Sequence, residues 1–214
     1  MLTFDIITLF PELFSAHLNT LPLKRALEKN LLKVNLHNLR DFAIDKRGTV
    51  DDKPYGGGVG MILMIEPIYK ALESISKTKN HKIVLLAPSG KKYTQKTALE
   101  FSKCEQIILI CGRYEGVDAR VESLTTDVIS IGDYVLSGGE LPALAIMEST
   151  VRLIPNVLEK EQAVKLESFS DGFLEHPQYT RPEDFKGVKV PEVLLSGDHK
   201  RISDWKKKNS EPVS

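Results

Sequence analysis

Three short apolar segments, each followed by a loop of small or polar residues, most constrain how this 214-residue chain can fold. They predict strands at residues 82–87, 106–111 and 127–131, with helices at 94–103, 117–124 and 140–153. Strands that alternate with helices are typical of an α/β fold with a mostly parallel sheet.

The N-terminal part of the chain extends this pattern. Residues 2–9 are apolar and β-branched, as in a buried strand, and residues 32–39 alternate between apolar and polar, as in a half-buried strand. Helices are expected from Pro11 onward, at 23–30 and at 66–77. The chain therefore supplies two more strands to the same sheet.

Regular patterning is lost between Arg40 and Gly60, a stretch that contains the triplet Gly56–Gly58. Loops of this length in compact domains are usually functional or disordered. The sequence leaves two interpretations open, a lid over a site and a flexible loop.

The pattern changes again after Pro155. Residues 157–170 are polar, as in a linker, and the proline-containing part that follows ends in a basic, helical segment around DHKRISDWKKK. We predict one domain at residues 1–158, an interdomain linker at 159–170 and a small C-terminal domain at 171–214.

Charge is balanced overall but uneven along the chain. The 29 basic and 29 acidic residues exclude a histone-like polycation, and a hydrophobic content of 42% excludes a disordered chain. Residues 159–185 carry 3 basic and 7 acidic residues, whereas residues 186–208 carry 7 basic and 3 acidic. Because phosphates respond to the local potential, a nucleic-acid partner remains compatible with zero net charge.

The cysteine and histidine content indicates a reduced, cytosolic protein. Two cysteines, Cys104 and Cys111, are too few for a disulfide framework, and no histidine shows zinc-ligand spacing with them. The N-terminus has no basic start before its apolar run, and no apolar stretch reaches 18 residues. We therefore expect neither a signal peptide nor membrane association.

The usual nucleotide motifs are missing. Gly90 and Lys91 lack the upstream glycine of a P-loop, and Pro11 follows the first strand where a dinucleotide-binding fold has glycines. The common Rossmann-type methyltransferase is disfavoured for the same reason.

Three successive strand-end loops, with the sequences APSG, GRYEG and GDYVLSGG, make the middle of the chain the candidate binding site, because open α/β sheets bind ligands at the carboxyl ends of strands. Gly112–Gly116 (GRYEG) fits either a ligand loop or a plain turn with a solvated arginine and glutamate. Residues 131–140 enter a helix whose free backbone N–H groups suit an uncharged heterocycle or a carboxylate. We interpret this third loop as a ligand loop.

Local pattern alone gives Arg152 and Glu167 ordinary roles. Arg152 lies near a helix end, where a cation complements the helix dipole. Glu167 lies in the polar linker, where a solvated carboxylate is expected.

Six longer motifs carry a family resemblance: DIITLFPELF, LRDFAIDKRGTVDDKPYGGGVGM, CGRYEGVD, SIGDYVLSGGELPA, HPQYTRP and VPEVLLSGDHKRISDW. Together they resemble the bacterial tRNA (guanine-N(1)-)methyltransferases of the TrmD type, which belong to the SPOUT methyltransferases. The resemblance implies an α/β fold with a deep trefoil knot, which no periodicity could indicate because knots are rare. Since typical relatives extend beyond the position of Ser214, it also implies a shortened helical C-terminal domain.

The resemblance implies that S-adenosylmethionine is bound in the knot. The residues assigned to it are Leu86, Ala87, Pro88, Gly112, Tyr114, Glu115, Gly116, Ile131, Gly132, Asp133, Tyr134, Val135, Leu136, Gly138, Gly139 and Pro142. The family is also reported to need magnesium, for which the sequence assigns no ligand. It further implies a cytoplasmic homodimer whose sites are built from both subunits.

The implied reaction methylates N1 of the guanine immediately 3′ of the anticodon, which maintains the reading frame. N1 carries a proton and charge develops at O6, so the chemistry needs a carboxylate and a cation. By position, Glu167 corresponds to the family's base and Arg152 to its arginine. The residues assigned to the tRNA are Ser168, Glu175, His176, Lys206 and Lys207.

Three positions depart from the family pattern. Glu167 stands where the family has aspartate, Glu175 where many relatives have aspartate, and Ala87 where a small polar residue is common. Glutamate reaches one methylene further, and a misplacement of about 1 Å can cost roughly a hundredfold in rate. Two other hypotheses therefore stay open, a non-catalytic RNA-binding relative and a SPOUT enzyme that acts on another RNA.

Overall fold

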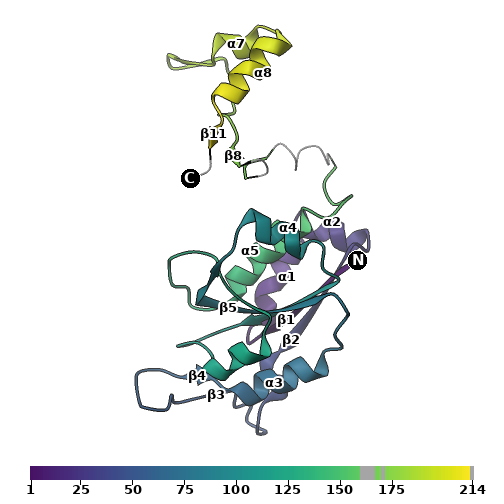
Figure 1. The fold of residues 1–214 in the computed structure, drawn as a ribbon, viewed down its shortest axis with the longest axis vertical. Coiled ribbons are helices and arrows are strands. Elements are labelled where there is room, and N and C mark those ends of the chain that lie inside the picture. Colours follow the sequence, from purple (N-terminus) through teal and green to yellow (C-terminus); the bar gives the residue numbers. More distant parts are fainter. Residues whose placement is uncertain (160–166, 170–171, 213–214) are drawn as a thin grey trace. The chain divides into compact units, whose positions relative to one another are not determined.

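The computed structural model describes residues 1–159, 167–169 and 172–212 of the chain. It divides into two compact units, Met1–Glu159 and Lys160–Ser214 (Figure 1). Most of the expected linker, residues 160–166 and 170, lies outside the described residues.

Unit 1 is built on a five-stranded sheet in the order β2-β1-β6-β5-β7, with every neighbouring pair parallel. The strands are β1 (Leu2–Thr8), β2 (Leu32–Asn38), β5 (His81–Lys92), β6 (Gln106–Cys111) and β7 (Asp127–Ser130). The expected α/β fold with a mostly parallel sheet is confirmed.

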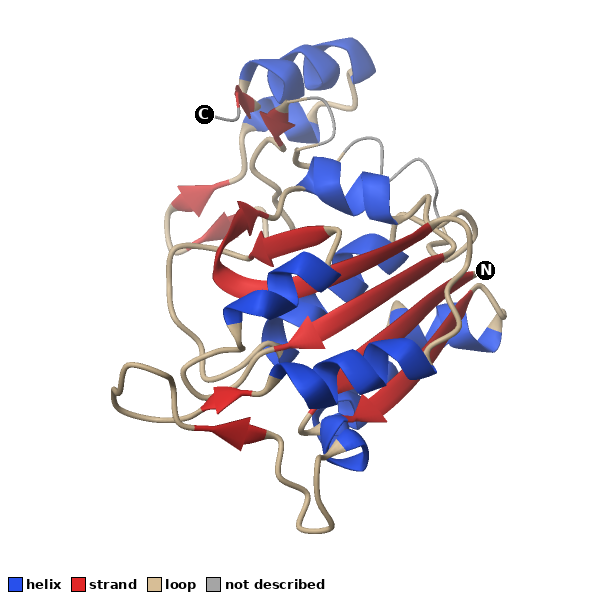
Figure 2. Ribbon diagram, turned by 60° about the horizontal axis from the view of Figure 1, so that its bottom comes forward, coloured by secondary structure: helices blue, strands red, loops and turns tan. Residues whose placement is uncertain are grey.

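Helices cover both faces of this sheet (Figure 2). They are α1 (Ser15–Leu18), α2 (Leu23–Glu28), α3 (Ile65–Ser74), α4 (Gln95–Phe101) and α5 (Glu140–Val151), with 3-10 turns η1 (Pro11–Phe14), η2 (Leu39–Phe42) and η3 (Ala119–Leu124). Phe4 and Ile6 pack on the face that includes α5, whereas Ile7 packs on the face of α3, because successive strand side chains point to opposite faces.

Strand β5 is longer than the sequence predicts. We expected a strand at 82–87 and a loop after it, but β5 continues to Lys92 and pairs with β7 a second time after a register shift between Leu86 and Lys91. Gly90 permits this return, since a Cβ atom there would lie 2.5 Å from the Ile129 backbone nitrogen. The expectation of a free loop after Ala87 is therefore wrong.

Two further boundaries differ from the sequence-based expectation. The helix expected at 117–124 is the 3-10 turn η3, and Asp118 caps it by accepting a hydrogen bond from the Arg120 N–H. Val157, expected in the linker, is fully buried in the core of unit 1. Its apolar side chain belongs to the cluster around α5, so the linker interpretation is wrong at this position.

The long stretch at 40–60 is partly ordered. It contains η2 and the strand β3 (Asp51–Asp52), which pairs antiparallel with β4 (Ile62–Leu63). Val50 is fully buried next to this pair. The glycine-rich segment between β3 and β4 is thus anchored at both ends.

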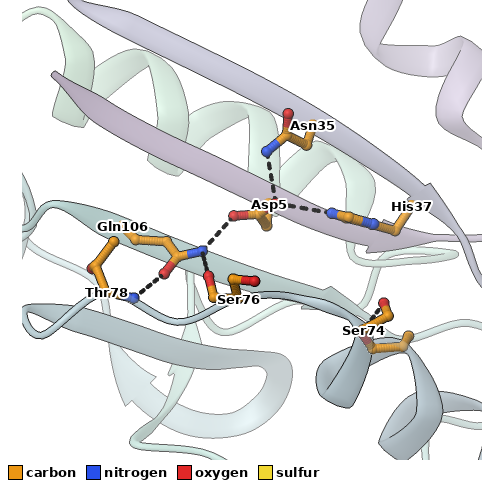
Figure 3. A network of polar contacts seen from close by, with 8 residues as sticks. Asp5, Asn35, His37, Ser74, Ser76, Thr78 and Gln106 are labelled. Atoms are coloured by element: carbon orange, nitrogen blue, oxygen red, sulfur yellow. Dashed lines mark hydrogen bonds and ion pairs between the residues drawn. The ribbon is translucent and has the colours of Figure 1, made fainter.

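A buried carboxylate, Asp5, joins three strands on the α3 side of the sheet (Figure 3). Asp5 Oδ1 accepts a 2.8 Å hydrogen bond from the side-chain amide of Asn35 and lies 2.9 Å from His37 Nε2. Asp5 Oδ2 accepts a 2.8 Å hydrogen bond from the side-chain amide of Gln106. Burial alone raises the pKa of Asp5, but the hydrogen bonds from His37, Gln106 and Asn35 lower it below its usual 3.8.

Unit 2 consists of short elements. Its strands are β8 (Phe173–Leu174) paired with β11 (Glu211–Pro212) and β9 (Asp184–Phe185) paired with β10 (Val188–Lys189), and its helices are α7 (Glu192–Leu195) and α8 (His199–Lys208). Asp198 caps α8 by accepting hydrogen bonds from the backbone N–H groups of Lys200 and Arg201. The basic, helical end expected from the sequence is confirmed.

Candidate functional site

A cavity of about 220 Å³ lies beside residues 86–88 in the middle of β5, where its pairing with β7 shifts, and beside the carboxyl ends of β6 and β7. Fifteen of the residues that the sequence analysis assigned to the cofactor line it, and Arg113, Val117, Ile129 and Ser130 complete the wall. The fifteen are Leu86, Ala87, Pro88, Gly112, Tyr114, Glu115, Gly116, Ile131, Gly132, Tyr134, Val135, Leu136, Gly138, Gly139 and Pro142. Segments far apart in the sequence thus form one concave site.

Asp133 was assigned to the same set but lies outside this lining. Its carboxylate pairs instead with the ammonium group of Lys92, at the far end of β5. The backbone turns at Gly132, so the neighbouring Tyr134 faces the cavity while Asp133 does not.

The loop that follows β7 passes directly over the end of β6. The Gly139 N–H donates a 2.9 Å hydrogen bond to the Gly112 carbonyl, and a Cβ atom on Gly139 would lie 2.7 Å from the Cys111 Cα. Only glycine fits at so close a backbone approach. This contact places the start of α5 at the cavity.

The glycine-rich segment between β3 and β4 contacts the cavity wall at Glu115. The Glu115 N–H donates a 3.0 Å hydrogen bond to the Met61 carbonyl, and a Cβ atom on Gly60 would lie 2.5 Å from the Glu115 Cγ. Tyr55 and Val59 on the same segment are 100% and 91% exposed. The structure anchors this segment beside the cavity; its role as a lid stays a prediction.

Sequence reasoning missed an ion pair in the cavity wall. Arg113 Nε donates a 2.9 Å hydrogen bond to Glu140 Oε2, and the other oxygen of that carboxylate accepts a 2.8 Å bond from the Thr8 hydroxyl. The guanidinium also lies 4.4 Å from the centre of the Phe10 ring. The interpretation of GRYEG as a plain turn left this arginine in solvent, because nothing in the local pattern reveals a buried partner 27 positions away.

The thiol of Cys111 lies next to this pair and is fully buried. Burial, and secondarily the Glu140 carboxylate, raise its pKa well above the usual range. A thiol in that state is a poor nucleophile, as expected for a packing residue.

Arg152 forms the C-cap of α5 and is half-buried. The helix end that carries it is fixed by Tyr93, whose hydroxyl lies 2.9 Å from Ser149 Oγ and 3.1 Å from Thr150 Oγ1. Burial raises the pKa of Tyr93 despite these two hydrogen bonds. The tyrosine therefore stays neutral and locates the end of the helix.

The remaining assigned residues lie in unit 2. Glu167 and Ser168 are half-buried, and Ser168 Oγ accepts a 3.0 Å hydrogen bond from the Glu175 N–H. The ring of His176 meets the edge of Trp205 at 6.0 Å, and Lys206 and Lys207 follow that tryptophan on α8. Burial first, and Lys206 second, lower the pKa of His176.

The described residues show neither a cluster of metal-binding side chains nor a membrane-spanning helix. Within residues 1–159, 167–169 and 172–212, no group of three or more His, Cys, Asp and Glu side chains could hold a metal ion. In the same part of the chain, every helix is too short or too polar to cross a membrane.

A parallel sheet with a cavity lined by small residues near its strand ends is typical of α/β proteins that bind a small ligand there. Comparison with known proteins identifies the family to which the chain belongs. The family described as tRNA (guanine-1)-methyltransferase TrmD matches residues 2–213. The chain belongs to this family, and the resemblance seen in the sequence motifs is confirmed.

Named relatives agree with this assignment. A tRNA (guanine-N(1)-)-methyltransferase from Dictyoglomus turgidum is 53% identical over 98% of this chain and 85% of its own length. Proteins of the same name from Clostridioides difficile and Staphylococcus aureus are 50% and 52% identical, over 97% and 94% of this chain and 91% and 83% of their own lengths.

Proposed function

We propose that this protein transfers a methyl group from S-adenosylmethionine to N1 of the guanine immediately 3′ of the anticodon in tRNA. The observation that carries the proposal is the cavity between the middle of β5 and the carboxyl ends of β6 and β7, in a chain about half identical to named tRNA (guanine-N(1)-)-methyltransferases. Methylation at this position maintains the reading frame, and a tRNA substrate favours a cytoplasmic location.

The cavity fits the proposed methyl donor. Gly138 and Gly139 let the loop after β7 pack against Arg113 and Cys111, and Leu86, Leu136 and Pro142 offer apolar contact for a flat heterocycle. Glu115 also lines the wall, and its carboxylate group lies beside Gly60. When bound, S-adenosylmethionine supplies a methyl group on a positively charged sulfur atom.

The reaction needs a base for the N1 proton and a cation for the charge at O6. We assign the base to Glu167, whose carboxylate occupies the position of the family's aspartate, and the cation to Arg152. The hydrogen bond from the Glu175 N–H to Ser168 fixes the turn immediately after Glu167, which limits where the longer side chain can reach.

Unit 2 is the proposed tRNA-binding domain. Its helix α8 presents Lys206 and Lys207 on an exposed surface, next to the aromatic contact between His176 and Trp205. Basic side chains bind phosphates and aromatic rings stack on bases, so this surface has the chemistry for RNA.

Two further parts of the proposal concern the fold and the assembly. We assign a trefoil knot to the region where the loop after β7 crosses the end of β6, since Arg113 and Gly138 pair there as an antiparallel bridge. We also assign a homodimer with composite sites, because Val135 in the cavity lining and Leu141 beside it are 85% and 61% exposed. The magnesium requirement implied by the family is assigned to no residue of this chain.

The decisive experiment is methyl transfer to tRNA transcripts that carry guanine or adenine at the target position. We expect the wild type to label the guanine transcript only, and Glu167→Gln to lower the rate by about a hundredfold or more, since general-base catalysis is typically worth that much. The matched control is Glu183→Gln, which makes the same chemical change at an exposed position of unit 2 and is expected to leave the rate unchanged.

Each alternative outcome has a definite meaning. Equal labelling of both transcripts, or labelling of neither, would contradict the proposal. Tight tRNA binding without turnover would instead establish a non-catalytic RNA-binding protein, and unchanged turnover in Glu167→Gln would remove the base assignment.

A further inference from the structure

The cavity wall contains two charged side chains, Arg113 and Glu115. If both acted on a ligand, their charges would cancel. Arg113, however, is paired at 2.9 Å with Glu140, whose side chain is only 2% exposed. The buried carboxylate of Glu140, which does not line the cavity, therefore neutralises the charge of Arg113. The net charge of the cavity wall is then the negative charge of Glu115.

The pair is held in one geometry. Thr8 donates a hydrogen bond to Glu140 from the end of β1, and the Phe10 ring supports the guanidinium from the same segment. A Cβ atom on Gly138 would collide with the Arg113 side chain, so the loop after β7 encloses it on another side. Because the guanidinium cannot turn away, loss of its partner would expose the cavity to an uncompensated positive charge.

We infer that Glu140, by neutralising Arg113, makes the cavity prefer a positively charged ligand over its neutral analogue. This inference rests on the proposed function, in which the methyl donor carries a sulfonium charge and S-adenosylhomocysteine, the product after transfer, does not. The two molecules differ by one methyl group and one charge. Glu140 is thus a positioning and specificity residue behind the cavity wall, and it acts through Arg113, which lines that wall.

The test compares dissociation constants for S-adenosylmethionine and S-adenosylhomocysteine, measured by calorimetry on the full chain. Glu140→Gln leaves Arg113 charged and is expected to shift the affinity ratio toward the neutral product by roughly fivefold, the effect of one charge across a partly screened site. Arg113→Gln leaves Glu140 charged and is expected to shift the ratio in the opposite direction.

Two controls separate charge from structure. The double variant Arg113→Gln with Glu140→Gln has a neutral pair and is expected to return the ratio to that of the wild type. Thr8→Val removes a hydrogen bond to Glu140 without changing charge, so it is expected to weaken both ligands by the same factor. Circular dichroism reports whether each variant folds.

If Glu140→Gln does not fold, Arg113→Gln and Glu115→Gln, the latter at an exposed position, still test the inference. They are expected to shift the affinity ratio of the two ligands in opposite directions. Ratios that stay at the wild-type value in the folded single variants Glu140→Gln and Arg113→Gln would overturn the inference. Failure of the wild type to bind either molecule would overturn the proposed function instead.

Discussion

The two units of this protein use their apolar and charged residues in opposite ways. In unit 1, Phe4, Ile107 and Ile108 are fully buried in the sheet, and the cavity wall is supported by a buried ion pair. Among the described residues of unit 2 none is buried, and Phe185 is 62% exposed. Unit 1 therefore supports its cavity from its own core, whereas Phe185 and the lysines of α8 in unit 2 are exposed, as the proposed binding of tRNA requires.

The difference follows from the secondary structure. Five parallel strands bury side chains on both faces, so unit 1 has two hydrophobic clusters that fix the strand ends. The strands of unit 2 are two residues long and can bury little. A small-molecule site needs the first arrangement, and recognition of a large, charged surface can use the second.

The largest expected effect tests this contrast in stability. Phe4→Ala in unit 1 is expected to lower the free energy of unfolding by about 3–5 kcal/mol, the usual cost of a large cavity in a core. Phe185→Ala in unit 2 is expected to change it by less than about 0.5 kcal/mol, as for exposed sites. Urea unfolding of both variants measures the difference, and equal losses would break the comparison.

An intermediate effect is expected at Asp5. Asp5→Asn removes a charged acceptor from three hydrogen bonds and is expected to lower the free energy of unfolding by about 1.5–3 kcal/mol. Because the pKa of Asp5 in the folded state lies below its unfolded value, this stabilisation is present above about pH 5 and is lost as the pH falls through the folded-state pKa.

The measurement is urea unfolding of Asp5→Asn and wild type from neutral to acidic pH. The difference between the two proteins is expected to shrink on acidification. Asp204→Asn on the exposed helix α8 is the matched control and should show no such change. A gap that widens at low pH would show that Asp5 is not stabilised as a carboxylate.

The smallest effect on stability is expected for substitutions on α8. These substitutions are expected to change RNA binding instead. Replacement of Lys206, Lys207 and Lys208 by alanine is expected to weaken tRNA binding by about tenfold at low salt, less at high salt, and to change turnover at saturation much less. The control replaces Lys79, Lys96 and Lys103 of unit 1, which removes the same charge from exposed positions. Unchanged binding in the α8 variant would place the RNA contact elsewhere, and equal weakening in both triple variants would indicate a general effect of charge.

Much of unit 1 could be predicted from the sequence, because short apolar runs and glycines report strands and close backbone contacts directly. The strand ends that line the cavity were found in this way, and so was the glycine-rich entry to α5. The return of β5 along β7 was not, since it depends on a register shift that leaves no periodic signal.

The sequence also did not predict which side chains that are distant along the chain contact each other. Local pattern left Arg113 open between a ligand loop and a solvated turn and placed Val157 in a linker, whereas Arg113 pairs with Glu140 and Val157 is buried in the core of unit 1. For Arg152 and Glu167 the pattern allowed only ordinary roles. Their proposed chemistry came from the family resemblance, because a reactive role leaves no mark on hydropathy.

The carboxylate of Asp5 also has a consequence for how the sheet is assembled. It faces Asn35 on one neighbouring strand and Ile108 on the other, and its hydrogen bonds reach His37 and Gln106, each two residues from those partners. A slip of β1 by one residue would turn this charge to the opposite, apolar face of the sheet. Only one alignment of the three strands lets Asp5 form these hydrogen bonds. Sheets with another register are therefore less stable, so the cluster selects the strand alignment on which the site depends.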